Sequence, residues 1–324
     1  MHWAGNRDIF LKTNMPGTSL YYHRVILALL LVAFMPTGVW AKTLIGVMIP
    51  GNASYYQEMH QAFLAALTTS SGANFEVIIQ RPFPDSIAMS NATRKLLAAE
   101  PNLIVTYGAS ATLAVLREKS RVPIIYGGVY DPPAAQISGP NLTGCGYKVP
   151  MTSLLRHLRE LKTIESLNVL YCSLENDSSR QLEELATLAR EQQISLNRID
   201  LKERGDIRKA QLAKGDAIFM TGSVVVATML DEIVAAAKPH QQPSASMFPD
   251  QDEAGMTIAL YHDPITQGRK IADLAAQVIS GRQPAQIKPE TLRSTSLMFN
   301  LREAKNMGVK IPFQLVAEAG KVIK

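Results

Sequence analysis

Two junctions in the first half of the chain combine serine hydroxyls with the backbone N–H groups of an expected helix start. They are residues 51–55 (GNASY) and 108–110 (GAS), and each follows an apolar run. Such groups bind carboxylates and other anions well. The simpler alternative is that each serine only caps its own helix. The ligand contacts that we expect at these two junctions are Asn52, Ser54, Tyr55, Gly108, Ala109 and Ser110.

A third junction carries an acidic side chain beside aromatic rings. The apolar run that begins at Pro123 ends in Tyr126-Gly-Gly-Val-Tyr130-Asp131-Pro132. Asp131 could hold an ammonium group, and Tyr130 could stack on an apolar ligand. The alternative is that Asp131 and Pro132 begin a turn.

The second half of the chain has two matching junctions. Residues 175–179 (ENDSS) follow one apolar run, and residues 221–223 (TGS) follow another. We expect both to face the first half across a cleft, although plain helix capping also explains their serine and aspartate content. The candidate ligand contacts here are Asn176, Asp177, Thr221 and Ser223.

The sequence motifs of common enzyme classes are missing. The chain has no G-x-S-x-G elbow, no H-E-x-x-H, no phosphate-binding P-loop and no G-x-G-x-x-G fingerprint. The histidines after residue 41 are scattered, and we expect His60 and His157 to be exposed on polar-sided helices. We therefore expect a protein that is not an enzyme, with no catalytic residues, no metal and no cofactor.

The elements that must position these junctions alternate between strand and helix patterns. Short apolar runs indicate buried strands, and apolar residues three and four apart indicate helices. Expected strands are 43–49, 75–80, 103–107, 123–126, 167–171, 196–201, 217–220, 243–247 and 256–261. Expected helices begin at Ser54, at Ser86, after Tyr107, after Tyr171, after Met220 and near Thr266, and a last helix runs from an Asn300 cap to Gly308.

Two successive βαβα sets predict an α/β protein with two Rossmann-like lobes, each built on a doubly wound parallel sheet. In a 2-1-3-4 strand order, the junctions at residues 51–55 and 108–110 lie side by side where the strand order reverses, and ligands bind there. The break falls near the Gly- and Pro-rich residues 139–150. We expect lobe 1 to contain residues 42–145 and a return over about 257–283, and lobe 2 to contain 146–256 and about 284–324. A single eight-stranded barrel is the structural alternative.

The first 41 residues predict a cleavable signal peptide. Arg24 precedes an apolar run over 25–34, and Ala41 follows small residues that suit a cleavage site. An uncleaved membrane anchor is the alternative. The short length of the apolar run speaks against it, because the run is about half the roughly 20 residues of a membrane-spanning helix. Translation could start at Met1 or at Met15. Export leaves open whether Cys145 and Cys172 form a disulfide or stay buried and free.

Charge gives no case for a nucleic-acid partner. The formal net charge is +5, and the basic residues form no run. After residue 41 no apolar stretch approaches membrane-spanning length. We therefore expect a periplasmic monomer that binds neither nucleic acid nor a bilayer.

Several segments resemble the ABC transporter substrate-binding protein family, the type I periplasmic binding proteins, and are similar to its tryptophan and aromatic amino-acid binding members. The resemblance is carried by Leu103-Ile-Val-Thr-Tyr-Gly-Ala-Ser110, by Pro123-Ile-Ile-Tyr-Gly-Gly-Val-Tyr-Asp-Pro132 with Asn141-Leu-Thr-Gly144, and by Phe299-Asn-Leu301 with Ile311-Pro312. It implies two lobes joined by a multi-strand hinge, a ligand between them, and a permease in the inner membrane as partner. It also implies that Ser110 holds a ligand carboxylate, that Asp131 holds an ammonium, and that residues 52–55 cover the ligand.

One departure from the family pattern concerns the second lobe. The junction after the 217–220 strand often carries an Asp in this family, whereas here it reads Thr221-Gly222-Ser223. We expect the solute receptor of an ABC importer, which binds a small molecule, such as an amino acid or another small carboxylate, by hinge closure. The alternatives are a ligand-sensing subunit that signals to a membrane partner and, with less support, a secreted hydrolase.

Overall fold

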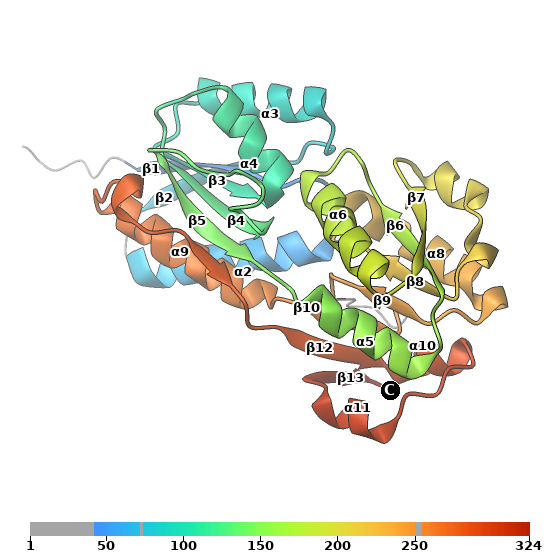
Figure 1. The fold of residues 1–324 in the computed structure, drawn as a ribbon. Coiled ribbons are helices and arrows are strands. Elements are labelled where there is room, and N and C mark those ends of the chain that lie inside the picture. The colour runs from blue at the N-terminus through green and yellow to red at the C-terminus, as the bar shows by residue number, and fades with distance from the viewer. Residues whose placement is uncertain (1–41, 72–73, 250–254) are drawn as a thin grey trace, which may run out of the picture. The chain divides into compact units, whose positions relative to one another are not determined.

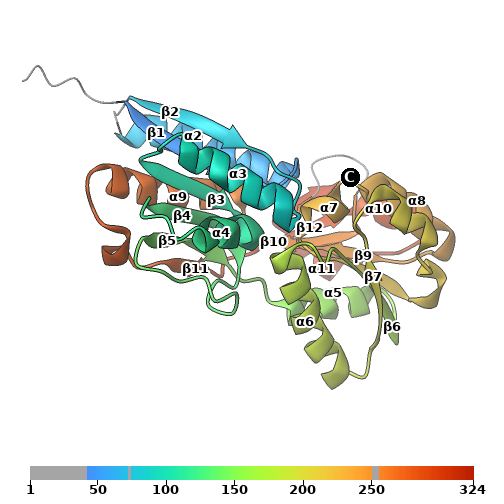
Figure 2. The ribbon, with the colours of Figure 1, turned by 90° about the horizontal axis from the view of Figure 1, so that it is seen from above.

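The computed structural model of the chain describes residues 42–71, 74–249 and 255–324. The expected signal peptide, residues 1–41, lies outside the described residues. None of the helices within the described ranges is long and apolar enough to cross a membrane. The described chain builds two mostly parallel sheets with helices on both faces of each, as Figures 1 and 2 show.

The first sheet has the strand order β11-β5-β4-β3-β1-β2, and its registered pairs are parallel. This contains the 2-1-3-4 order considered from the sequence. All five residues of β3 are buried, as a near-continuous apolar run predicts for a central parallel strand. The strands are β1 (Thr43–Met48), β2 (Phe75–Gln80), β3 (Leu103–Tyr107), β4 (Ile124–Tyr130), β5 (Leu142–Tyr147) and β11 (Glu290–Leu292).

Two pairs of helices cover the faces of this sheet. Helices α2 and α9 lie side by side on one face, and α3 and α4 lie on the other (Figure 1). Gly268 of α9 lets the two helices of the first pair approach closely, since a Cβ there would lie 2.8 Å from Ala62 Cβ. The helices are α2 (Ser54–Ser71), α3 (Ser86–Ala98), α4 (Gly108–Arg117) and α9 (Pro264–Ile279).

The second sheet has the order β13-β12-β10-β9-β8-β6-β7, and only its β10–β12 pair is antiparallel among the registered pairs. Helices α5 and α6 cover one face and α8 the other (Figure 2). The strands are β6 (Ser166–Tyr171), β7 (Ser195–Asp200), β8 (Ala217–Met220), β9 (Ser244–Ser246), β10 (Ile258–Tyr261), β12 (Ser296–Asn300) and β13 (Lys321–Ile323). The helices are α5 (Met151–Leu161), α6 (Asn176–Glu191), α7 (Val224–Ala227), α8 (Leu230–Ala237), α10 (Leu301–Asn306) and α11 (Phe313–Glu318), and 3-10 helices cover Arg204–Lys209, Leu212–Lys214, Lys238–His240 and Pro284–Gln286.

The chain passes three times between the two sheets within the described residues. The passages follow β5, β10 and β11. Strand β10, which we expected to return to lobe 1, pairs in the second sheet, whereas α9 packs on the first. Strand β11, which we expected in lobe 2, pairs with β5 of the first sheet. Hydropathy identifies a short strand but not its partner, so these boundaries follow sheet membership instead.

The expected exposure of two histidines was wrong, and the capping alternative considered for Ser110 is excluded. His60 and His157 are buried, at 4% and 3% exposure, because their rings pack against Tyr107 and Phe299, respectively. Ser110 lies inside α4, which begins at Gly108, and therefore does not cap that helix. In contrast, Asn300 caps α10 by accepting from the Glu303 N–H, as its spacing predicted.

Candidate functional site

The strand ends of the two sheets meet, and most of the predicted site lies where they do. Tyr55, Gly108, Ala109 and Tyr130 of the first lobe are buried there, together with three predicted residues of the second lobe. Those three are Asp177, Thr221 and Ser223. Asn52, Ser54 and Asn176 are exposed, and Ser110 and Asp131 are partly buried.

The Asp177 carboxylate bridges the two lobes. It comes from the start of α6, and its two oxygens accept the backbone N–H groups of Ala109, at 2.6 Å, and Tyr130, at 2.8 Å. Ala109 lies in the first turn of α4, where unpaired N–H groups attract an anion. The anion position that we predicted at this junction is therefore filled by a side chain of the second lobe.

The Ser110 hydroxyl takes part in the same contact. It accepts the backbone N–H of Asn176 at 3.0 Å, so two hydrogen bonds join the starts of α4 and α6, and the bond from Tyr130 joins α6 to the end of β4. Gly108 makes room for this approach. Its φ is +76°, and a Cβ there would lie 2.6 Å from the Tyr56 hydroxyl and 3.1 Å from Asp177 Oδ2.

Glu175 occupies the corresponding position in the second lobe. Its carboxylate accepts the Ser223 hydroxyl at 2.5 Å and the N–H groups of Val224 and Val225 at 2.9 and 3.0 Å. The buried Ser223 hydroxyl also caps α7 by accepting from Val226. The predicted residue Thr221 bonds Ser178 at 2.8 Å, so the TGS junction is saturated by its own lobe.

Aromatic rings from both lobes pack together at the centre. Tyr55 of α2 stacks on Phe248, which follows β9, with ring centroids 4.4 Å apart and an interplanar angle of 16°. Tyr56 meets the same Phe248 ring edge-on at 5.8 Å, and Tyr147 lies 6.2 Å from Tyr55. Burial raises the pKa of these tyrosines well above the ordinary value, so their hydroxyls are neutral.

Two buried glutamines fix the polar ends of these rings. Gln267 of α9 donates to the Tyr55 hydroxyl at 2.6 Å and accepts the Gly128 N–H at 3.1 Å. Gln181 of α6 accepts the Gly222 N–H at 2.6 Å and donates to the Tyr147 hydroxyl at 3.4 Å. Each ring is therefore held by both packing and a hydrogen bond.

Asp131 has a cationic partner already. It pairs with Lys148 at 2.9 Å, and Lys148 also pairs with Glu184 of α6 and lies 4.7 Å from the centre of the Tyr130 ring. Partial burial opposes ionisation of Asp131, but the hydrogen bond and charge of Lys148 outweigh it and lower its pKa. Asp131 thus belongs to a charge cluster between α6 and the passage after β5, and a ligand ammonium would have to compete with Lys148.

Sequence reasoning missed several residues of this centre. Tyr56, Tyr147 and Phe248 were not selected, although Tyr56 adjoins a selected tyrosine and Phe248 follows an expected strand. Glu175 was seen only as part of a capping sequence. Its role depends on β6 and β8 being neighbours, which no local signal reveals.

His60 gives a first testable prediction. Its Nδ1 lies 3.1 Å from the Tyr107 hydroxyl, and burial, aided by the charge of Arg81, lowers its pKa to about 4. A lowered histidine pKa means that stability is lost as pH falls from about 6.5 towards 4, and is unaffected above that range. We expect the NMR signals of the His60 ring to stay constant from pH 8 to pH 5.5, whereas a titration midpoint near 6.5 would contradict this burial.

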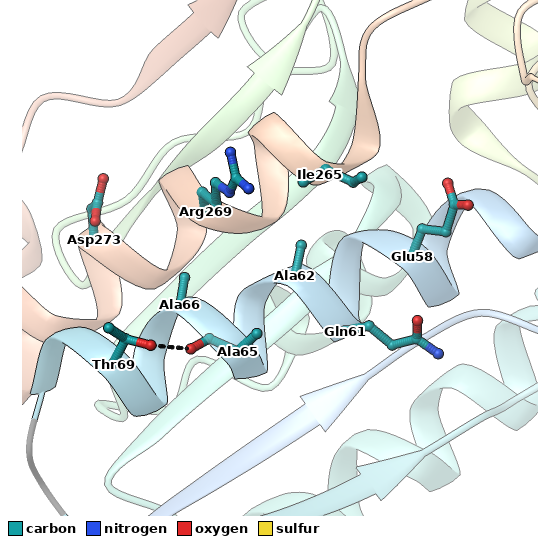
Figure 3. A pocket seen from close by; sticks show the side chains of 9 residues that line it. All are labelled: Glu58, Gln61, Ala62, Ala65, Ala66, Thr69, Ile265, Arg269 and Asp273. Carbon is teal, nitrogen blue, oxygen red and sulfur yellow. Dashed lines mark hydrogen bonds between the residues drawn. The ribbon is translucent and has the colours of Figure 1, made fainter.

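A wide groove lies elsewhere on the first lobe, between α2 and α9. It has a volume of about 810 Å³, and Ala62, Ala65 and Ala66 form its floor between Glu58 and Arg269 (Figure 3). Its lining comes from two helices of one lobe and includes no strand end. We therefore take the junction between the lobes, where strand ends of both sheets lie, as the candidate ligand site.

The remaining chemistry-bearing groups do not form a second centre. No cluster of three or more metal-ligating side chains exists among the described residues. Cys145 and Cys172 are both buried and free. Burial raises the pKa of each thiol to about 12, which makes both unreactive near neutral pH.

Comparisons with known proteins agree on family and fold. The profile of the family described as ABC transporter substrate binding protein matches residues 62–323. A search among curated proteins found no match. Among solved structures, the ABC domain of Streptococcus pneumonia in complex with L-Trp is similar, with a TM-score of 0.81 and 19% identity over 87% of this chain and 100% of that chain.

Two further solved structures have the same fold. A conserved domain protein from Vibrio cholerae has a TM-score of 0.82 and 20% identity, over 87% of this chain and 99% of that chain. A solute binding protein from Bacillus halodurans with bound myo-inositol has a TM-score of 0.58 and 13% identity, over 84% and 99%. The fold predicted from the sequence, two lobes of the type I periplasmic binding protein class, is confirmed.

Proposed function

Because this chain belongs to the family of ABC transporter substrate binding proteins, we propose that it is the extracytoplasmic solute receptor of an ABC importer. The observation that supports this proposal most is the aromatic contact between the lobes, in which Tyr55 and Tyr56 of the first lobe pack against Phe248 of the second. The family's function is binding, and we assign no catalytic role to any residue. The expected partners are a small ligand and a membrane permease.

Closure supplies the mechanism. Asp177, Ser110 and Phe248 form contacts that exist only while the two lobes meet. A ligand that touches both lobes stabilises the closed form over the open form, so binding shifts the equilibrium between them. The three passages between the sheets act as the hinge, and the permease would recognise the closed form.

The contacts of the site constrain the ligand. L-Trp and myo-inositol are bound by relatives that share only the fold with this chain. In this chain the rings of Tyr55 and Phe248 favour a ligand with an apolar face. A carboxylate ligand, as expected from the resemblance, would have to displace Asp177 from the start of α4.

A ligand screen tests the proposal. Amino acids, amines, sugars and small acids should be examined by thermal unfolding, where a true ligand at 100 times its Kd stabilises the protein by about 2.7 kcal/mol. We expect at least one stabilising compound, a smaller radius of gyration on binding, and no chemical turnover. Turnover of the bound compound, or no binding by any class, would contradict a receptor role.

The ring stack provides a matched pair of variants. Phe248→Leu keeps apolar bulk but removes the stack on Tyr55, which is worth about 0.5–1.5 kcal/mol. We expect the Kd of a ligand from the screen to rise about three- to tenfold. Phe313→Leu is the control because Phe313 is 82% exposed. Equal ligand affinity in both variants would show that the ligand does not contact the Phe248 ring.

A further inference from the structure

The junction between the lobes contains two carboxylates that the proposed function does not explain. Asp177 fills the start of α4, and Glu175 fills the start of α7. Both lie within three residues of one loop and are only 5% and 6% exposed. The helix starts that would normally receive an anionic ligand group are therefore occupied by the protein itself.

Neither carboxylate has a cationic partner. Within the described residues Glu175 and Asp177 form no ion pair, and every hydrogen-bond donor that they meet is a backbone N–H or the Ser223 hydroxyl. A positive charge that acts on Asp177 is that of Arg180, which is partly buried on the next turn of α6 and forms no ion pair with it among the described residues. Burying carboxylates without a counter-charge is unfavourable, and burial raises the pKa of Asp177 to about 7 and that of Glu175 above its ordinary value.

The other elements packed against Asp177 add no counter-charge. Helix α2 contributes the neutral Tyr56 hydroxyl, and β5 contributes neutral Tyr147. Lys148 is engaged by Asp131 and Glu184, and the buried ring of His60 is held neutral. The junction between the lobes therefore places two buried carboxylates without an ion pair beside aromatic faces, which themselves attract cations.

We propose that the natural ligand is an organic cation, an amine with an apolar body, that places its ammonium beside Asp177 and its apolar face against Tyr55, Tyr56 and Phe248. This rests on the proposed receptor function and narrows its ligand class. A ligand cation replaces the missing counter-charge as the lobes close. A zwitterion brings a carboxylate for which both helix starts are already taken, and an anion is repelled.

Matched probes test the class. Tryptamine, L-tryptophan, tryptophol and indole-3-propionate share one ring but are a cation, a zwitterion, a neutral alcohol and an anion. Phenethylamine, L-phenylalanine, 2-phenylethanol and 3-phenylpropionate repeat the series, and choline and agmatine extend the cations. At pH 8 we expect a cation to bind at least about tenfold more tightly than its matched partners, since hydrogen bonds to charged groups contribute about 1.5–3 kcal/mol.

The outcomes separate this inference from the function beneath it. If a zwitterion, a sugar or an anion binds and no cation binds more tightly, the cation assignment is overturned while the receptor function stands. If no compound of any class binds, both fail. If none of the cations binds at 1 mM while another class does, the cation assignment is again overturned.

A charge-removing variant gives a second, independent readout. Asp177→Asn loses one acceptor for the other lobe and should weaken every ligand, but it should weaken the cation at least tenfold more than the neutral alcohol. Asp131→Asn is the control, because Asp131 is paired with Lys148, and it should leave cation affinity unchanged. Cation affinity of the unaltered protein should fall as pH drops from 8 to 5.5, when Asp177 takes up a proton, and should be flat for Asp177→Asn. The reverse assignment, with loss in Asp131→Asn alone, would overturn the proposal.

Discussion

Gly108→Ala should abolish ligand binding, with a loss of at least about 100-fold in affinity, while the protein stays folded. The added methyl would lie 2.6 Å from the Tyr56 hydroxyl and 3.1 Å from Asp177, at a backbone φ of +76°. Tyr56 is 3% exposed and packed against other rings, so it cannot move aside cheaply. Tyr56 belongs to the first lobe, as Gly108 does, so the contact with Asp177 of the second lobe is the one that opposes closure. Small-angle scattering and calorimetric titration measure closure and affinity.

The control for this variant is Gly308→Ala. Gly308 has a similar φ of +67°, but its nearest neighbour beyond the local chain is 3.4 Å away and it lies outside the cleft. Both variants should lose about 1–3 kcal/mol of stability from backbone strain. Only Gly108→Ala should lose ligand affinity and closure, and unchanged affinity in Gly108→Ala would show that the closed contact at α4 is not needed for binding.

Glu175→Ala should have the largest effect on stability, about 3 kcal/mol or roughly 6–12 °C in Tm. The substitution leaves the Ser223 hydroxyl and two backbone N–H groups of α7 buried without their acceptor. Unpaired buried donors carry the full cost of their desolvation. Thermal and urea unfolding without ligand measure the loss.

Glu183→Ala on the exposed side of α6 is the control and should change stability by less than about 0.5 kcal/mol. Glu175→Gln retains one acceptor oxygen and should fall between the two. A loss below about 1 kcal/mol for Glu175→Ala would mean that water readily replaces the carboxylate and that the cleft is wetter than these contacts indicate.

Much of the fold followed from local patterns. The apolar runs at 103–107 and 217–220 match β3 and β8 because buried parallel strands need continuous apolar residues, and the run at 75–80 matches β2, a partly buried edge strand. The order of β2, β1, β3 and β4 also fits the considered topology. The partners of β10 and β11 could not be read, because a strand of three or four residues carries no mark of the sheet that it joins.

The sequence predicted where the site residues lie along the chain, but not which hydrogen-bond partners they have in the structure. The junctions at Gly108 and Asp177 were selected separately, and the structure joins them in one hydrogen bond. A local rule treats Asp177 as a cap of its own helix, whereas its oxygens reach the backbone of the other lobe. Tertiary packing decides which distant side chain accepts from the unpaired N–H groups at a helix start, so only the structure shows the acceptor.

The two buried carboxylates, Glu175 and Asp177, have a consequence for how the receptor would meet its permease. An unloaded receptor that closed readily would occupy the permease without cargo and delay loaded copies. Closure without a cation buries the Asp177 carboxylate among neutral partners only. This burial is most unfavourable above pH 7, where the carboxylate is ionised. The two carboxylates would therefore disfavour closure of the ligand-free protein. Protonation at acidic pH would remove this effect.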